Sequence, residues 1–187
     1  MKVKFRFSGR GGQGIKFLGS ALVRVAMTAD LYATLSVDYT PSVRGGPIFC
    51  DVVISSEPIA YPYCDADADY FVALDQKGFE RAVECISDKT RSYIDTNSID
   101  DIAEKIITKG VINRVPLIKH AHEKNVTGAL NILSLGFLSE ELKKAENPRF
   151  SEDNYTQVFH NMKNSENNIR TFQLGKDLYN EIISGTA

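Results

Sequence analysis

The sequence opens with the run Val3-Lys4-Phe5-Arg6-Phe7, followed directly by the cluster Gly9-Arg10-Gly11-Gly12-Gln13-Gly14. Alternation of apolar and charged residues in the run predicts a strand. Glycines at 9, 11 and 14 fit the pattern G-x-G-x-x-G, which permits a tight turn, close backbone approach to an anion and close packing of helix on strand. The apolar stretch from position 14 predicts a helix that points free N–H groups at the glycines. This geometry favours a phosphate, a carboxylate or an acidic side chain of a partner, and the motif alone does not choose among them.

After this opening, strand-like and helix-like segments alternate along most of the chain. Such alternation predicts an α/β protein built on a three-layer, mostly parallel Rossmann-like sheet covered by helices. The predicted strands span residues 3–7, 34–37, 48–54, 70–74, 92–94 and 111–115, and the predicted helices span residues 14–29, 79–86, 117–123 and 126–137, with Gly136 near the end of the last helix.

The last third of the sequence differs in character. A charged helix is predicted over residues 140–147 and is broken by Pro148. The polar stretch 161–168 precedes a final segment whose apolar residues are spaced as in a helix. We expect a single domain over residues 1–187, with an α/β core over about 1–138 and a helical arm over about 139–187. The apolar positions of the final segment are Ile169, Phe172, Leu174 and Leu178.

Composition excludes several classes of protein. With 187 residues, 43% of them apolar and 25% charged, the chain has the size and balance of one ordinary globular domain. Its 22 basic and 24 acidic residues give a net charge of -2, and no basic run suggests nucleic-acid binding. The first residues lack a signal-peptide core, and no apolar stretch approaches the roughly 20 residues of a membrane span. We therefore expect a cytoplasmic protein.

No catalytic or metal-binding pattern is present. Cys50, Cys64 and Cys85 fit neither a disulfide framework nor a cluster motif, so we expect reduced, structural thiols. Asp65-Ala-Asp67-Ala-Asp69 resembles the start of a calcium loop, but the sixth and twelfth positions hold tyrosine and glutamine instead of glycine and glutamate. A polar turn is the better interpretation. Asp75, at the end of a predicted strand, is a better ligand candidate, although a structural role is more common there.

A second glycine loop, Tyr39-Thr40-Pro41-Ser42-Val43-Arg44-Gly45-Gly46-Pro47, lies between two predicted strands. In a parallel sheet it would emerge beside the first glycine loop. Arg44 is a candidate cation for a carboxylate or phosphate, and Gly45 and Gly46 would let the backbone approach it. The alternative is a turn with an exposed arginine, because glycine and proline mark turns whatever their function.

Taken together, these motifs resemble the gamma subunit of 2-oxoacid:ferredoxin oxidoreductases. The similarity rests on the order and spacing of Ser8–Gly14, Tyr39–Gly46 and Asp51–Pro62, and it extends to Asn125-Val126, the region of Gly136 and Asn168–Gly175. The second loop and the run that follows it look closest to the branch that acts on 2-oxoglutarate or broad 2-oxoacids. One departure is Thr40-Pro41-Ser42, where relatives often have Gly-Pro-Glu.

The resemblance implies a subunit of an enzyme that decarboxylates a 2-oxoacid, 2-oxoglutarate or pyruvate, on thiamine diphosphate with magnesium. Such an enzyme passes electrons through iron-sulfur clusters to ferredoxin and delivers the acyl group to coenzyme A. The partners implied are alpha and beta subunits, with or without a delta subunit. No catalytic residue is expected in this chain, and the isolated chain should be inactive. Its expected role is assembly and closure of the coenzyme A side of the site, with candidate cofactor-binding residues Gly9, Arg10, Gly11, Gly12, Gln13, Gly14, Arg44, Gly45 and Gly46.

Two other interpretations stay open at this point. The first is a stand-alone nicotinamide or flavin binder, in which Asp38, 24 residues after Gly14, would bind a ribose hydroxyl. The second is a purely structural subunit whose glycines serve packing alone.

Overall fold

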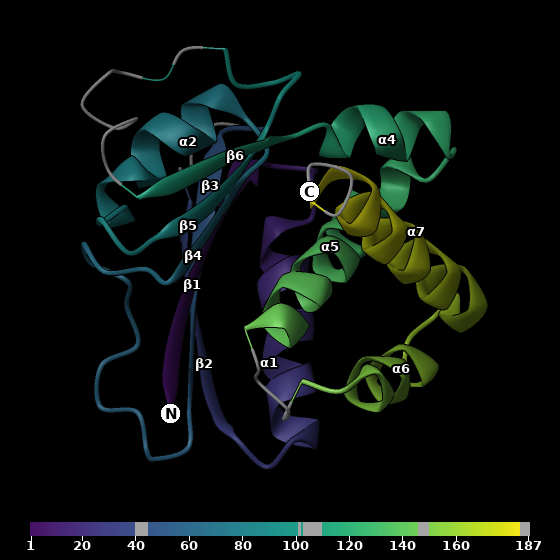
Figure 1. Ribbon diagram of the computed structural model, residues 1–187. Coiled ribbons are helices and arrows are strands. Elements are labelled where there is room, and N and C mark those ends of the chain that lie inside the picture. The colour runs from purple at the N-terminus through teal and green to yellow at the C-terminus, as the bar shows by residue number, and fades with distance from the viewer. Residues whose placement is uncertain (40–44, 101, 103–109, 146–149, 184–187) are drawn as a thin grey trace.

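The computed structural model describes residues 1–39, 45–100, 102, 110–145 and 150–183. Over these residues the chain forms one six-stranded sheet with strand order β2-β3-β1-β4-β5-β6, and helices lie on both of its faces (Figure 1). The strands are β1 (Lys2–Arg10), β2 (Tyr32–Tyr39), β3 (Pro47–Ser55), β4 (Tyr70–Ala73), β5 (Arg91–Asp95) and β6 (Val111–Val115). The helices are α1 (Ile15–Thr28), α2 (Gln76–Ala82), α4 (Leu117–Glu123), α5 (Leu130–Lys144), α6 (Glu152–His160) and α7 (Ser165–Ile183), with 3₁₀ turns η1 (Val83–Cys85) and η2 (Thr127–Ala129).

The sheet is mostly parallel, as predicted, with one reversed strand. β1 pairs in parallel with β4, β4 with β5, and β5 with β6. β3 lies antiparallel between β1 and β2, so those two outer neighbours run in the same direction. The connection from Tyr39 to Pro47 is too short for the crossover that parallel neighbours need, and it therefore forces β3 to run backwards.

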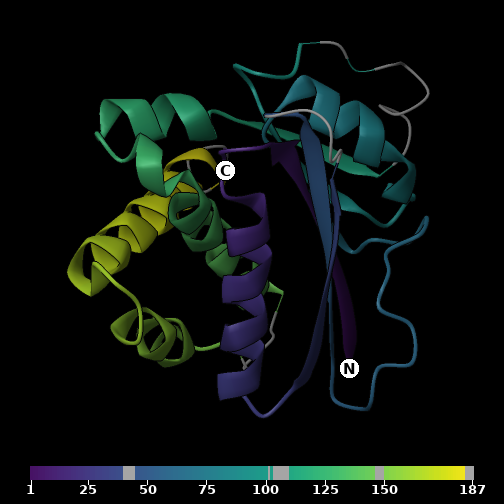
Figure 2. The same ribbon diagram turned by 180° about the vertical axis from the view of Figure 1, so that it is seen from behind.

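Side-chain alternation along β1 divides the core into two layers. Phe5 and Phe7 face α1 and lie in the larger apolar cluster with Leu18 and Leu22. On the other face, α2 contributes Phe79 to a smaller cluster. Figures 1 and 2 show α2 on one side of the sheet and α1, α5, α6 and α7 on the other. The predicted three-layer α/β fold is confirmed.

The prediction for Gly136 is wrong. This glycine lies in the middle of α5, which continues to Lys144, and the separate charged helix predicted from residue 140 is the end of the same helix. Residues 146–149, including Pro148, lie outside the described residues. A Cβ atom on Gly136 would lie 2.0 Å from the carbonyl oxygen of Phe172 on α7, and one on Gly175 would lie 2.0 Å from that of Leu133. The two glycines let α5 and α7 cross with their backbones in contact.

α6 lies within the helical arm expected over about 139–187, but it was not predicted as a separate helix. α6 begins after Ser151, which forms a reciprocal capping box with Asn154. It buries Tyr155 and Phe159 in the same cluster as the sheet and α1. No helix among the described residues is long and apolar enough to cross a membrane.

Candidate functional site

The first glycine loop lies where the sheet changes its winding direction. β1 extends through Arg10, the turn follows, and α1 begins at Ile15. From β1 the chain passes over α1 towards β2 on one side, and from β4 it passes over α2 towards β5 on the other. In open α/β sheets, ligands bind at the carboxyl ends of the strands at such a switch point.

The start of α1 has the features that favour an anion. Gly14 is its N-cap, with φ 75° in the left-handed region, and provides no capping side chain. The first turn of α1 contains no acidic residue. The N–H groups of that turn and the positive end of the helix dipole therefore face the loop without a carboxylate of the helix to neutralise them.

Gln13 holds the loop together from inside. Its side-chain oxygen accepts the backbone N–H of Arg10 at 2.9 Å, and its side-chain nitrogen donates to the carbonyl of Leu74 at 3.0 Å. The end of β1 is thereby tied to the residue that follows β4. Gly9 makes room for this arrangement, because a Cβ atom there would lie 2.5 Å from Gln13 Oε1. Both residues were predicted to bind a cofactor, and the structure gives each of them an internal contact.

Gly78 of α2 packs against the same loop, and the sequence did not predict this contact. A Cβ atom on Gly78 would lie 2.5 Å from the carbonyl oxygen of Gly9. The N–H groups of Gly78 and Lys77 donate to Asp75, which caps α2. Asp75 thus has a structural role as a helix cap, the more common of the two roles considered for it from the sequence. A glycine within a helix, three residues after its cap, was the signal for this close approach.

The second glycine loop touches the first. The N–H of Gly11 donates to the carbonyl of Gly46 at 2.9 Å, and a Cβ atom on Gly11 would lie 3.1 Å from the Cα of Gly45. The prediction that the two loops share one edge is confirmed, although the reason is an antiparallel hairpin instead of parallel neighbours. Arg44 lies outside the described residues.

A residue of α5 completes the surroundings of Gly14. A Cβ atom on Gly14 would lie 2.9 Å from Nδ2 of Asn131, so the carboxamide packs directly on the N-cap of α1. The sequence carried no signal for this contact, because 117 positions separate the two residues. By contrast, Gly12 and Gly45 both have positive φ, and no atom of the described residues lies within 4 Å of their Cβ positions. Those two glycines present bare backbone to open space.

Asp38 does not fit the dinucleotide hypothesis. Its carboxylate forms an ion pair with Arg81 of α2. Its strand, β2, is separated from β1 by β3, whereas the fingerprint needs the acid on a strand beside the glycine loop.

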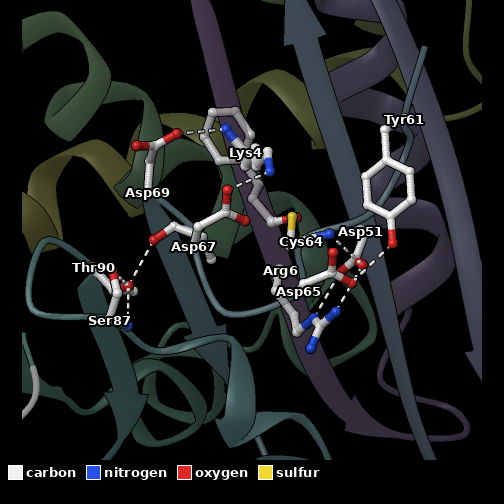
Figure 3. Close-up of polar contacts among 12 residues, drawn as sticks. Lys4, Arg6, Asp51, Tyr61, Cys64, Asp65, Asp67, Asp69, Ser87 and Thr90 are labelled. Carbon is white, nitrogen blue, oxygen red and sulfur yellow. Dashed lines mark hydrogen bonds and ion pairs between the residues drawn. The ribbon is translucent and has the colours of Figure 1, made fainter. Parts of the chain in front are cut away.

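A second polar region lies on the α2 face of the sheet (Figure 3). Arg6 donates to both carboxylate oxygens of Asp51, at 2.6 and 2.8 Å, and lies 4.5 Å over the ring of Phe49. Asp51 also accepts the N–H of Cys64 at 2.9 Å. These contacts anchor the segment after β3 to the sheet.

The aspartates that resembled a calcium loop have structural contacts. Asp67 forms an ion pair with Lys4 at 2.5 Å, and Asp69 accepts the Lys4 backbone N–H at 2.8 Å (Figure 3). Across the part of the chain that the structure describes, no group of three His, Cys, Asp or Glu side chains could hold a metal ion.

The three cysteines are free and buried. Burial raises the pKa of each thiol, that of Cys85 to about 12. This shift favours the thiol form, which is a poor nucleophile.

Comparison of the chain with known proteins identifies its family. Residues 4–178 match the model of the family described as pyruvate ferredoxin/flavodoxin oxidoreductase. The 2-oxoglutarate synthase subunit KorC of Methanothermobacter marburgensis is 29% identical, over 97% of this chain and 98% of the relative. The KorC subunit of Methanocaldococcus jannaschii is 32% identical over 74% of each chain.

Two solved structures share the fold. The gamma subunit of a keto/oxoacid ferredoxin oxidoreductase from Geobacter sulfurreducens superposes with a TM-score of 0.75 at 22% identity, covering 96% of this chain and 97% of that one. The 2-oxoglutarate:ferredoxin oxidoreductase of Magnetococcus marinus, solved with 2-oxoglutarate, coenzyme A and succinyl-CoA, gives a TM-score of 0.79 at 23% identity, covering 97% of this chain and 31% of that one. The chain belongs to the pyruvate ferredoxin/flavodoxin oxidoreductase family and is a subunit of a 2-oxoacid:ferredoxin oxidoreductase.

Proposed function

We propose that this chain serves in a complex that oxidises 2-oxoglutarate to succinyl-CoA with reduction of ferredoxin. The observation that carries this choice of substrate is the match to a 2-oxoglutarate synthase subunit over nearly the full length of both chains. Alpha and beta subunits would be its partners, and coenzyme A chemistry would place the complex in the cytoplasm.

The catalytic cofactors belong to the partners in this proposal. Thiamine diphosphate would supply the carbanion chemistry, and iron-sulfur clusters would carry the electrons. In this chain the Cys50 and Cys64 thiols are buried and donate to the carbonyls of Ile15 and Phe5. This chain would act by shaping and closing the site.

The glycine loops would face the coenzyme A side of that site. Gly12 and Gly45 leave backbone open to an approaching ligand, the start of α1 favours phosphate, and the exposed Arg10 adds a positive charge. Gly9, Gly14 and Gly78 serve packing, as the structural interpretation of the glycines expected. We assign packing and ligand approach to different glycines of the site.

Substrate competition tests the proposal. The complex should show the highest kcat/KM for 2-oxoglutarate when pyruvate and branched 2-oxoacids are compared in an anaerobic viologen-reduction assay. A preference of tenfold or more for pyruvate would overturn the choice of substrate and leave the family assignment intact.

The role in coenzyme A binding has its own test. Arg10→Ala in the assembled complex should raise the KM for coenzyme A by about threefold to tenfold, as expected for loss of one exposed charge contact, and leave the KM for 2-oxoglutarate unchanged. Lys163→Ala, which removes an exposed charge between α6 and α7, is the matched control. An unchanged KM for coenzyme A in both Arg10→Ala and Arg44→Ala would show that the loops are an interface only.

A further inference from the structure

The two edge strands of the sheet, β2 and β6, are protected to different degrees against pairing with another strand. β6 has five residues, includes Arg114 and is followed at once by Pro116. β2 has eight residues, Tyr-Ala-Thr-Leu-Ser-Val-Asp-Tyr, and each pairs with a single residue of β3 without a bulge. Natural edge strands usually carry charged residues, proline or a bulge, because an unprotected edge is a template for another strand. β2 has neither proline nor a bulge, and Asp38 is its single charged residue.

The face of β2 away from α1 has a projection at one end and a groove at the other. Tyr32, at the start of the strand, is 53% exposed. The groove at the end has a volume of about 620 Å³, and its lining includes Ser36, Asp38, Tyr61 and Tyr63. Because side chains alternate along a strand, Tyr32, Ser36 and Asp38 share one face.

The groove combines aromatic and acidic groups with the guanidinium group of Arg6. Tyr61 and Tyr63 are both exposed and form an edge-to-face pair with ring centroids 5.2 Å apart. The Tyr61 hydroxyl donates to Asp65 at 3.1 Å (Figure 3). A phenol ring with its hydroxyl fits such a site, since rings pack edge to face and the hydroxyl can donate to a carboxylate.

We propose that β2 pairs antiparallel with β2 of a second copy of this chain, with Leu35 at the two-fold axis. In this register Ala33 lies opposite Val37 and Tyr32 lies opposite Asp38 of the other copy. Tyr32 of each copy enters the groove of the other, so the interface is self-complementary, as two-fold symmetry requires. Asp38, the single charged residue of the strand, therefore lies opposite a tyrosine and not opposite Asp38 of the other copy. A shift of pairing by one residue would set the polar face of one strand against the apolar face of the other.

The mass of the isolated full-length chain in solution tests this proposal. Light scattering after size exclusion, across a concentration series, should give about twice the 20.8 kDa chain mass. Tyr32→Asp sets a carboxylate opposite Asp38 and should raise the dimer dissociation constant at least about tenfold. Tyr32→Phe, which keeps the ring that enters the groove, should keep the dimer.

The other edge provides the control. Val111 of β6 is 56% exposed, slightly more than Tyr32, and Val111→Asp should leave the mass unchanged. Because both substituted side chains are exposed, thermal unfolding should report native folding in all variants. A monomer at every concentration would overturn the proposal, as would a dimer that Val111→Asp dissociates and Tyr32→Asp does not. If the chain is monomeric and Tyr32→Asp instead releases other subunits of the complex, the edge belongs to a different partner and self-association is wrong.

Discussion

At the scale of single residues, the glycines of the site have different structural roles. Gly78 and Gly9 bring two backbones into contact, whereas Gly12 and Gly45 border open space. The spacing of glycines in the sequence showed that a loop was present, but it could not show which glycine contacts which atom. That information lies in α2 and α5, which reach the loop only in the folded chain.

Gly78→Ala should destabilise the protein by about 1–3 kcal/mol, because the new methyl group would meet the Gly9 backbone at 2.5 Å and backbone cannot rotate away. Chemical denaturation monitored by circular dichroism measures this free energy of unfolding. Gly128→Ala is the control, since nothing lies within 4 Å of its Cβ position, and it should change stability by about 0.5 kcal/mol or less. Equal effects of the two substitutions would contradict the close contact.

Glu141 should make stability depend on pH in the acid range. Burial raises the pKa of this carboxyl group, but hydrogen bonds from Tyr179, Arg91 and Tyr93 outweigh burial and leave the pKa below its usual value of 4.5. The unfolded chain therefore binds the proton more readily than the folded protein. The stabilisation is complete above pH 4.5 and is lost as the pH falls through the folded-state pKa.

Denaturation at a series of pH values checks this sign. Glu141→Gln should lower stability at pH 7 and reduce its loss below pH 4.5. Glu123→Gln, on a carboxyl group that is 56% exposed, should leave the profile unchanged. A Glu141→Gln profile as steep as that of the parent protein would mean that the acid sensitivity arises elsewhere.

At the scale of elements, the sequence predicted strands better than their directions. A buried apolar run reads the same in a parallel or an antiparallel sheet, so β3 was identified but its reversal was not. The distance between β2 and β3 along the chain contains that information, since a short link allows only antiparallel neighbours.

The helices of the C-terminal third were harder to predict, because their limits and stability depend on contacts with distant parts of the chain. Gly136 looked like a helix end, yet it marks the crossing of α5 with α7. α6 is short, and its capping box at Ser151 was the available signal. Packing against α1, which the sequence does not display, is what stabilises so short a helix.

The crossing of α5 and α7 makes a prediction at this scale. Gly175→Ala should separate the helices, because its methyl group would lie 2.0 Å from the Leu133 carbonyl oxygen. A loss of about 2 kcal/mol or more in the free energy of unfolding is expected, with weaker near-ultraviolet circular dichroism from Tyr179 and its neighbours. Unchanged stability would show that the helices can move apart freely.

At the scale of the whole molecule, the order of the motifs identified the family that the comparisons confirm. A single glycine fingerprint also fitted a dinucleotide binder, and strand order decided against it, because β3 separates Asp38 from the glycine loop. Strand order follows from long-range pairing and is not written in any local pattern. The unprotected β2 edge likewise became apparent only once the sheet was assembled.

Anaerobic purification of the tagged chain from its native cells tests the central claim most directly. We predict that subunits binding thiamine diphosphate and iron-sulfur clusters co-purify with it, that the preparation reduces viologen when 2-oxoglutarate and coenzyme A are supplied, and that the chain purified alone is inactive. A chain that purifies without such partners and tightly holds a nicotinamide or flavin dinucleotide would contradict the claim.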